Sequence, residues 1–399
     1  MNILVISHMY PYPANRTKGI FVLQQNLELQ RQGCQLTVFA PRPWAPFPLG
    51  LINPRWQNYG SMAKAPSYDG IAALRPSYLA FPGGLGIAGC GRRLYRALNK
   101  TVSDFHNNQP FDLIHAHTIF PDGQAGLFLK KQLGIPLVVT VHGKDVQQTA
   151  YRNARCLQAM INVVGGADMV VAVSAKIKGM LDQLTKMPEK TVVINNGFDS
   201  SQFMRIISSG SPGAIISVSN LVNSKGIALN IQAVAALRHK YPHIKYTVIG
   251  GGEDAANLQQ LARDLKVEDL IEFTGRVSNK KVPGFLANAQ VFSLPSSMEG
   301  FGIAYLEAMA AGLPVIGCRG EGIADVVRSG ETGLLIDPNN LDALVRALDQ
   351  MLADPDWTRE MGLRARTLAL NKFSWQVNAE KMINLFSEIN CWSPDKGDG

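Results

Sequence analysis

The pattern of hydrophobic positions predicts two successive series of buried strands. Short apolar runs rich in β-branched residues alternate with longer amphipathic stretches almost to the end of the chain. Strands buried on both faces read as continuous apolar runs, so this pattern is typical of parallel sheets covered by helices on both sides. The first series is predicted at 2–7, 35–40, 111–117, 136–143, 168–174 and 191–197. The second is predicted at 214–219, 245–252, 270–275, 290–296, 313–318 and 332–337.

A polar stretch with several serines and glycines, 199–213, separates the two series. We therefore expect two doubly wound, Rossmann-like domains, 1–197 and 198–373, in an α/β protein. Three helical segments, 340–353, 356–371 and 374–389, close the chain, and the last is expected to pack back onto the first domain as a helix over about 374–390. Open α/β sheets bind ligands beyond the carboxyl ends of their strands, so two facing sheets predict an interdomain cleft.

Composition favours a soluble globular protein over membrane-spanning, disulfide-rich and metal-clustered classes. The 399 residues are 46% hydrophobic, and the N-terminal run reads as a first strand without the charged flank of a signal peptide. The longest uncharged stretches fall short of the ~20 apolar residues of a membrane-spanning helix. We expect a cytoplasmic protein, or one peripheral to the inner face of the membrane. Five scattered cysteines without C-x-x-C spacing argue against disulfides and zinc, and they are expected to be reduced and buried.

Charge is divided unevenly along the chain. Residues 1–195 carry a net +11 and residues 196–399 a net −3, which together give the overall +8. Aromatic and basic residues are interleaved at 42–59 and 91–100. This half could dock on an anionic membrane surface or bind an acidic acceptor, although a solvated basic face explains the same pattern. No nucleic acid partner is expected.

The clearest candidate site in the second half is the stretch SSMEGFGIAYLEAMAAGLPVIG, 296–317. Its glycines allow a tight turn, and the alanine-rich run that follows predicts a helix beginning near residue 302. The free N–H groups of Phe301, Gly302 and Ile303 and the helix dipole would favour a phosphate or a sugar oxygen. Glu299 before the helix and Glu307 within it could bracket a polyhydroxylated ligand. The alternative is that both are ordinary solvated acids.

Glycines and a lysine mark other βα turns. Lys225-Gly226 and Gly250-Gly251-Gly252 follow strands of the second half, and Gly19 opens the first helix of the first half, where amides or a lysine could hold phosphates. Gly250, Gly252 and Ala255 also fit G-x-G-x-x-A with Asp269 further on, the dinucleotide fingerprint. The match lies on the second strand of its domain and not the first. A nicotinamide enzyme is therefore a distant alternative.

Histidines end several strands of the first half. His8, His117 and His142 lie at or just beyond strand ends and would face one crevice, and His115 shares a face of its strand with His117. His142, followed by Gly143-Lys144-Asp145, is the catalytic candidate, against the alternative of an ordinary buried histidine. A metal site of His115, His117 and either His142 or Asp145 is a further alternative. We expect no metal, because helix amides and lysines can neutralise a diphosphate.

Taken in order, these motifs resemble those of the retaining glycosyltransferases of family 4, which have the GT-B architecture of two facing Rossmann-like domains. The resemblance covers nearly the whole chain. The features that carry it are Gly19, HGKD (142–145), NNGFD (195–199), NLVNSKG (220–226), VIGGGE (248–253), FTGRV (273–277), EGFGIAYLE (299–307) and ETGLLID (331–337).

The resemblance implies transfer of a hexose from a nucleotide diphosphate-sugar, UDP-sugars being favoured, to a glycan, lipid-linked or polysaccharide acceptor with retention of configuration. It assigns Glu299 and His142 to the reacting sugar and Glu307 to the ribose. The base would lie at the amides near Val277, and the diphosphate at Lys225 and Gly19. Phe301, Gly302 and Ile303 would offer amides to the donor, with Gly252 in a neighbouring turn. No metal or other cofactor is implied.

Two positions depart from the family pattern. Asn220 stands where an arginine is usual near the diphosphate, so Lys225 would carry more of the charge, and Glu321 stands where a second small residue is common. Two other functions remain open on the same architecture. One is a nucleotide-sugar epimerase or hydrolase, and the other is a catalytically idle binding protein.

Overall fold

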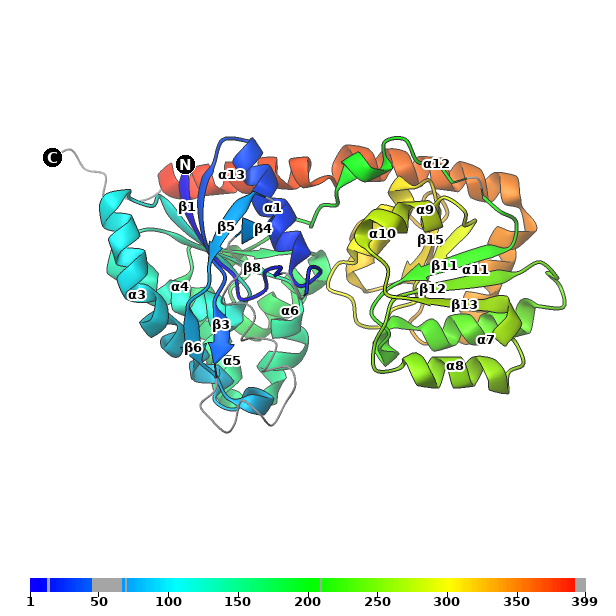
Figure 1. The fold of residues 1–399 in the computed structure, drawn as a ribbon, viewed down its shortest axis with the longest axis horizontal. Helices are drawn as coiled ribbons and strands as arrows, with labels where there is room; N and C mark the ends of the chain where they lie inside the picture. The colour runs from blue at the N-terminus through cyan, green and yellow to red at the C-terminus, as the bar shows by residue number, and fades with distance from the viewer. Residues whose placement is uncertain (13–14, 45–66, 69, 209, 392–399) are drawn as a thin grey trace. The chain divides into compact units, whose positions relative to one another are not determined.

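The computed structural model describes residues 1–12, 15–44, 67–68, 70–208 and 210–391. The chain divides into two compact units (Figure 1). Unit 1 is Met1–Asn195 together with the C-terminal helix from Gln376 onward, and unit 2 is Asn196–Trp375. Of the two segments with interleaved basic and aromatic residues, 42–59 lies outside the described residues from 45 onward.

Unit 1 is built on a sheet with the strand order β10-β9-β8-β7-β1-β2-β5-β4, parallel except for the β4–β5 pair. A second pair, β3–β6, stands apart from this sheet. The strands are β1 (Asn2–Ile6), β2 (Gln35–Phe39), β3 (Arg42–Trp44), β4 (Ser67–Tyr68), β5 (Ile71–Leu74), β6 (Ser77–Leu79), β7 (Leu113–His117), β8 (Leu137–Val141), β9 (Met169–Ala172) and β10 (Thr191–Val193).

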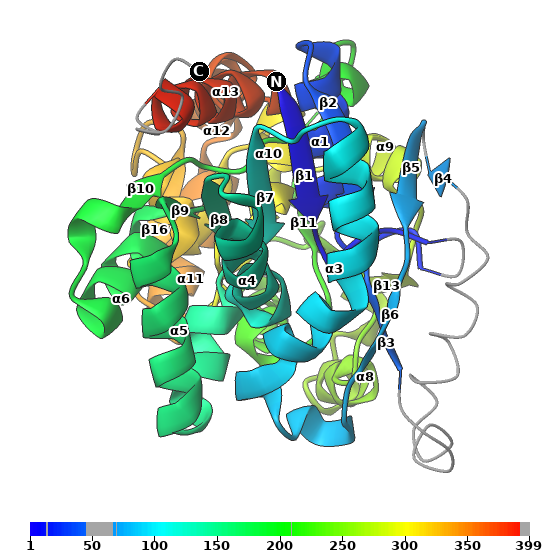
Figure 2. The same cartoon turned by 90° about the vertical axis from the view of Figure 1, so that its left-hand side faces the viewer.

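Helices cover both faces of this sheet (Figure 2). They are α1 (Ile20–Arg31), α3 (Cys90–Asn108), α4 (Gln124–Leu133), α5 (Ala154–Gly166), α6 (Ala175–Thr185) and α13 (Trp375–Cys391). Helices α1 and α13 pack on the face that carries Val5 and Val138, where Phe386 of α13 is fully buried in the core. Helix α4 packs on the other face, with the backbone of Gly126 close to Leu137. The last helix of the chain thus belongs to the core of the first unit.

Unit 2 has an all-parallel sheet with the order β13-β12-β11-β14-β15-β16. Counted along the unit, this is the order 3-2-1-4-5-6 of a Rossmann fold, whose strand order reverses between β11 and β14. The strands are β11 (Ala214–Val218), β12 (Lys245–Ile249), β13 (Ile271–Gly275), β14 (Val291–Ser293), β15 (Val315–Cys318) and β16 (Gly333–Ile336).

Two helical layers enclose the sheet of unit 2. The helices are α7 (Ile227–Leu237), α8 (Ala255–Asp264), α9 (Val282–Leu286), α10 (Ile303–Ala310), α11 (Leu341–Ala353) and α12 (Pro355–Lys372). Helix α7 contacts α8 and α11, whereas α10 contacts α9 and α12. Among the described residues, no helix has the length and apolar character needed to cross a membrane.

The predicted strands of both series are present, each slightly shorter than its apolar run. Four strands were missed, β3 to β6. They are only two to four residues long and are separated by glycine and proline residues such as Gly70 and Pro76, so they carry little periodic signal. The expectation that all cysteines are buried is wrong for Cys391, which is exposed near the end of α13, while the other four are buried.

Candidate active site

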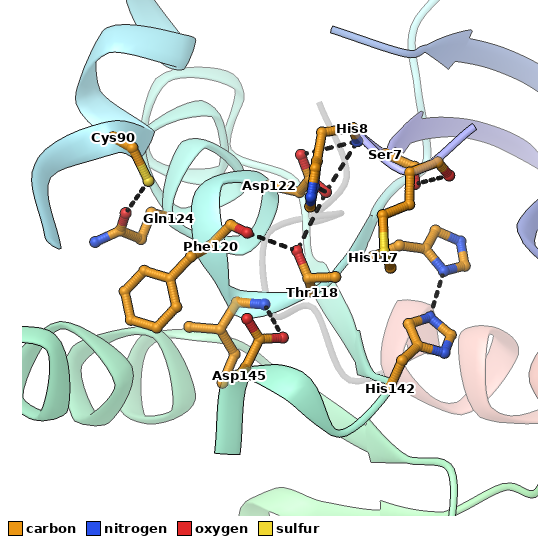
Figure 3. Close-up of polar contacts among 12 residues, drawn as sticks. Ser7, His8, Cys90, His117, Thr118, Phe120, Asp122, Gln124, His142 and Asp145 are labelled. Carbon is orange, nitrogen blue, oxygen red and sulfur yellow. Dashed lines mark hydrogen bonds and ion pairs between the residues drawn. The ribbon is translucent and has the colours of Figure 1, made fainter. Parts of the chain in front are cut away.

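The strand order of unit 1 reverses at β1, and several polar residues of the segments after β1 and β7 contact one another there. β1 lies between β2 and β7, so the segments that follow β1 and β7 leave the sheet side by side. His8 follows β1, and its Nδ1 lies 2.8 Å from Oδ2 of Asp122, in the segment after β7 (Figure 3). The backbone N–H of His8 also donates to that carboxylate, as does the hydroxyl of Thr118. Sequence reasoning identified His8 but missed Asp122, which carries no motif of its own.

His142, the catalytic candidate, forms a row with the two histidines of β7. Its Nε2 lies 3.2 Å from Nδ1 of His117, and the two rings stack with an interplanar angle of 11° (Figure 3). His115 lies beside His117 with ring centroids 4.3 Å apart, and its Nε2 lies 2.8 Å from the Thr140 hydroxyl. Phe21 of α1 packs on the His142 ring. The structure therefore brings His115, His117 and His142 together. His8 is held separately by its contact with Asp122.

Burial keeps the histidine row neutral. Desolvation lowers the pKa of His142 to about 3, with a smaller contribution from the charges of His115 and His8. The pKa of His115 is lowered to about 3 for the same reason, and that of His117 falls well below its usual value. A neutral His142 can donate one hydrogen bond and accept another, and one of these goes to His117. It can therefore contact a sugar hydroxyl, but it is not a cation at neutral pH.

Asp145, three residues after His142, is buried and supports the segment after β7. Its carboxylate accepts a hydrogen bond from the backbone N–H of Ile119 at 3.1 Å (Figure 3). Desolvation raises its pKa to about 6, opposed by that hydrogen bond. Among the described residues, no cluster of three or more His, Cys, Asp and Glu side chains is arranged to hold a metal ion. In this structure Asp145 and the histidines serve as hydrogen-bonding partners of protein groups.

Gly19 occupies the start of α1 with a left-handed backbone, φ +63°. A Cβ added there would lie 2.3 Å from the carbonyl oxygen of Met9, so the turn after β1 passes too close for any side chain. No side chain caps the helix at Gly19. At this start the backbone N–H of Ile20 donates to the carbonyl of Thr17 and that of Val22 to the carbonyl of Gly19. The role of Gly19 toward a phosphate stays a prediction.

In unit 2 the predicted residues meet where the strand order reverses. Lys225 follows β11 and Glu299 follows β14, and Nζ of Lys225 lies 2.5 Å from Oε2 of Glu299. Both side chains are largely buried, with 17% and 15% of their surface exposed. Ligands of doubly wound sheets bind at this reversal, so the pair lies at the expected position for one.

Helix α10 begins beside this ion pair. Its first residue is Ile303, preceded by Gly302 with φ +92°, and no side chain caps it. A Cβ at Gly302 would lie 2.5 Å from the Tyr305 ring, so the turn requires glycine. Phe301 is buried and packs near Phe373. A helix start without a side-chain cap is a place where an anion would be favoured.

Glu321 has a role that the sequence did not reveal. Its carboxylate accepts a hydrogen bond from the backbone N–H of Glu299 at 2.6 Å, and its residue is buried. The acid that departs from the family pattern thus holds the turn that carries Glu299. Asn220, the other departure, is exposed just after β11.

Glu307 lies one turn into α10, on its partly exposed side. Desolvation raises the pKa of its carboxyl to about 7, and the negative charge of Asp199 raises it further in the same direction. A carboxyl held in so poorly hydrated a place without a cation is costly when it ionises. Hydrogen-bond donors from a ligand, such as two sugar hydroxyls, would relieve that cost.

Gly252 and Val277 follow the neighbouring strands β12 and β13. A Cβ at Gly252 would lie 2.1 Å from the carbonyl oxygen of Leu221, so the turn after β12 packs directly on the turn after β11. Val277 is half-buried between β13 and a short helical turn, Asn279–Lys281. Unit 2 therefore holds Lys225, Glu299, the α10 amides and Glu307 along one edge, with Gly252 and Val277 on adjacent turns. Unit 1 holds His142 and Gly19.

The comparisons with known proteins agree with this arrangement. Residues 19–202 match the family described as Glycosyltransferase Family 4, and residues 202–368 match Glycosyl transferases group 1. TuaC of Bacillus subtilis, named as a teichuronic acid biosynthesis glycosyltransferase, is 30% identical over 90% of this chain and 92% of its own length. The chain belongs to glycosyltransferase family 4.

The other relatives of this glycosyltransferase point the same way. The N-acetyl-α-D-glucosaminyl L-malate synthase of Bacillus anthracis is 28% identical over 73% of this chain and 78% of its own. The sucrose-phosphate synthase structure from Thermosynechococcus elongatus has a TM-score of 0.78 at 22% identity, covering 98% of this chain and 99% of that one. The architecture is GT-B, and the enzyme is a hexosyltransferase. The findings do not favour the epimerase, hydrolase, idle-binder or nicotinamide-enzyme alternatives.

Proposed function

We propose that this glycosyltransferase moves a hexose from a UDP-sugar to a glycan, lipid-linked or polysaccharide acceptor, with retention of anomeric configuration and without a metal cofactor. The proposal rests on three groups at one edge of the unit 2 sheet. They are Lys225, the uncapped start of α10 and Glu307. Together they offer a cation, free amides and an acceptor of hydroxyl hydrogens, which match a diphosphate and a ribose.

Two relatives support the choice of donor class. A structure of HepE from Anabaena, with a TM-score of 0.72 at 20% identity, was solved in complex with UDP and glucose and covers 97% of this chain and all of that one. Over 45% of this chain, a Mycolicibacterium smegmatis relative is 34% identical and is named as a GDP-mannose-dependent mannosyltransferase. The diphosphate is common to both donors. UDP is our proposal for the base, and GDP is the competing one.

The proposed roles follow from where charge develops during transfer. Breaking the anomeric C–O bond leaves negative charge on the departing diphosphate and positive charge on the sugar ring. Lys225 and the amides of Phe301, Gly302 and Ile303 stabilise the first, and Glu299 stabilises the second while holding the donor sugar. His142 contacts that sugar as a neutral hydrogen-bonding group, and Gly19 offers its turn to the diphosphate. Gly252 and the amides near Val277 lie along the nucleotide, with the base at Val277.

A calorimetric titration with UDP tests the donor site directly. Glu307→Ala should weaken UDP binding roughly tenfold to a hundredfold, because the ribose hydroxyls lose a charged partner. The matched control is Glu268→Ala, which removes an exposed acid elsewhere in unit 2 and should leave the affinity unchanged. The proposed donor site would be contradicted if Glu307→Ala bound UDP as tightly as the wild type and also bound GDP as tightly as the wild type.

Product analysis tests the transfer itself. UDP-hexoses and GDP-mannose are supplied with saccharide and lipid-linked acceptors, and the anomeric configuration of the product is read by proton NMR. We expect the product to keep the configuration of the donor, and His142→Ala to lower kcat on the order of 10²- to 10³-fold. Release of free or epimerised sugar as the sole product would instead favour a hydrolase or epimerase.

A further inference from the structure

Unit 1 contains a cavity of about 520 Å³ beside the point where its strand order reverses. His8 and Phe120, from the segments after β1 and β7, form one side of it. The other described lining residues come from β3, β6, the segment 80–87, the start of α3 and the segment after β8. Its volume lies within the range of roughly 300–1,000 Å³ usual for small-molecule sites. Doubly wound sheets place their ligands at such a reversal.

Three basic side chains and no acid line this cavity among the residues that the structure describes. Arg93, Lys144 and Arg152 line it, and none of its lining residues is an aspartate or glutamate. Within the described part of the chain, none of these three cations is in an ion pair. The nearby carboxylates of Asp122 and Asp145 are buried and accept hydrogen bonds from protein groups.

Backbone carbonyl groups hold the two arginines in place. Arg152 Nη2 donates to the carbonyl of Gly83 at 2.7 Å. Arg93 donates from Nε to Leu79 and from Nη2 to Gly86, at 2.7 and 3.0 Å. Gly83 and Gly86 have left-handed backbones, φ +65° each, which residues with side chains rarely adopt. A neutral carbonyl orients a guanidinium without cancelling its charge, so these contacts fix two cations that remain able to bind an anion.

Aromatic rings complete the wall. Tyr78 and Phe120 are buried, and Phe81 lies under the Arg93 guanidinium at 5.3 Å. Aromatic faces suit the apolar C–H face of a sugar ring, whereas a cavity for a simple anion has no need of them. The three cations together with the aromatic rings favour a ring-shaped ligand that carries a negative charge.

We propose that this cavity binds the acceptor, and that the acceptor is an acidic saccharide with a carboxylate or phosphate group held by Arg93, Arg152 and Lys144. As an acceptor site it rests on the transfer proposed above. The anion positions the sugar ring against Tyr78, Phe81 and Phe120. His8, kept in place by Asp122, lies in the same wall.

Ligand-observed NMR on the full chain without donor tests this binding. The probes are methyl β-D-glucuronide, glucose 6-phosphate and the neutral methyl β-D-glucoside. We expect at least one of the two anionic sugars to bind roughly tenfold or more tightly than the glucoside, with an affinity that falls as salt is raised. The preferred anionic probe identifies the group as a carboxylate or a phosphate. A second arm measures sedimentation of the full chain with vesicles that contain phosphatidylglycerol. Equal binding of all three sugars would overturn the proposal, as would binding to these vesicles without binding to any of the sugars.

Two substitutions locate the site. Arg152→Gln and Lys144→Gln should each weaken binding of the preferred anionic sugar roughly tenfold, the loss expected for one charge-assisted contact. The matched control is Arg92→Gln on α3, which removes an exposed cation that lies over Phe128 and does not line the cavity. Because Lys144 is exposed, its variant should fold as the wild type does. Unchanged affinity in both Arg152→Gln and Lys144→Gln would overturn the proposal.

A parallel titration of the wild type with UDP separates this inference from the proposed function. UDP binding without binding of either anionic sugar would overturn the acidic acceptor and leave the donor site intact. Binding of an anionic sugar without UDP binding would support the cavity and contradict the proposed donor.

Discussion

At the scale of single residues, the two glutamates of the 296–317 stretch have different environments. Glu299 is paired with Lys225 at 2.5 Å and is further held through its backbone by Glu321. Among the described residues no cation forms an ion pair with Glu307, and its pKa is raised to about 7, mainly by desolvation. One acid is therefore held within the protein by an ion pair and a backbone hydrogen bond, and the other is costly to ionise until a ligand supplies donors.

The raised pKa of Glu307 predicts a pH-dependent stability. Between about pH 4.3, the value for a free glutamate, and about pH 7, folded unit 2 retains a proton that the unfolded chain releases. The stability of unit 2 should therefore fall as pH rises through this window. Glu307→Gln cannot ionise, so it should gain on the wild type between pH 5 and pH 8 by at most about 3 kcal/mol. Urea unfolding followed by circular dichroism measures this gain, and identical pH profiles would refute it.

The Lys225–Glu299 pair should show energetic coupling. Because both side chains are largely buried, removing either one leaves a charge with poor hydration. Lys225→Met, Glu299→Gln and the double variant form a cycle, and we expect a coupling of about 1–3 kcal/mol in the free energy of unfolding. The exposed pair Arg319–Asp337 is the control, expected at below about 1 kcal/mol. Equal coupling in the two pairs would show that burial adds nothing at Lys225.

At the scale of elements, turns that follow the strands pack against each other through their backbones, at glycine residues. The turn after β12 packs on the turn after β11 so closely that Gly252 has no room for a side chain. In unit 1, Gly19 has the same relation to the turn after β1. These contacts bring backbone close to the side chains that lie where each sheet reverses its order.

Gly252→Ala should therefore disturb both folding and the donor site. The added methyl group would meet the Leu221 carbonyl at 2.1 Å, so one of the two turns must move. We expect a loss of about 1–3 kcal/mol in stability together with weaker UDP binding. The control is Gly179→Ala in α6, where an added Cβ meets nothing within 4 Å and helix propensity predicts a gain of about 1 kcal/mol. Thermal unfolding and UDP titration of both variants provide the comparison.

At the scale of the whole molecule, the chain leaves unit 1 at Asn195 and returns to it at Gln376. Four side chains of α13 enter the core of unit 1, namely Ala379, Met382, Leu385 and Phe386. Asn378 adds a buried contact, because its side-chain oxygen accepts a hydrogen bond from Gln25 of α1 at 2.6 Å. Unit 1 is therefore complete only when the C-terminal helix is present.

This connectivity predicts unequal behaviour of fragments. A fragment of residues 1–195 should be poorly folded, whereas the fragment 196–375 should fold and retain UDP binding. In the full chain, Phe386→Ala should cost unit 1 about 3–5 kcal/mol. Circular dichroism and hydrogen exchange of the two fragments test the prediction. A cooperatively folded 1–195 fragment would contradict the role of α13.

Sequence by itself determined the two parallel sheets, the strand positions and the residues that end the strands. These features follow from local periodicity and from glycine and histidine positions, which the primary structure displays directly. The short strands β3 to β6 and the exposure of Cys391 could not be predicted from the sequence. The partners of His8 and Glu299 could not be predicted either, because Asp122 and Glu321 are distant in sequence from the residues they hold. The different environments of Glu299 and Glu307, and the gathering of three basic residues around the cavity of unit 1, were decided only by the tertiary structure. Burial and pairing depend on which segments meet in space, and local sequence carries no record of that.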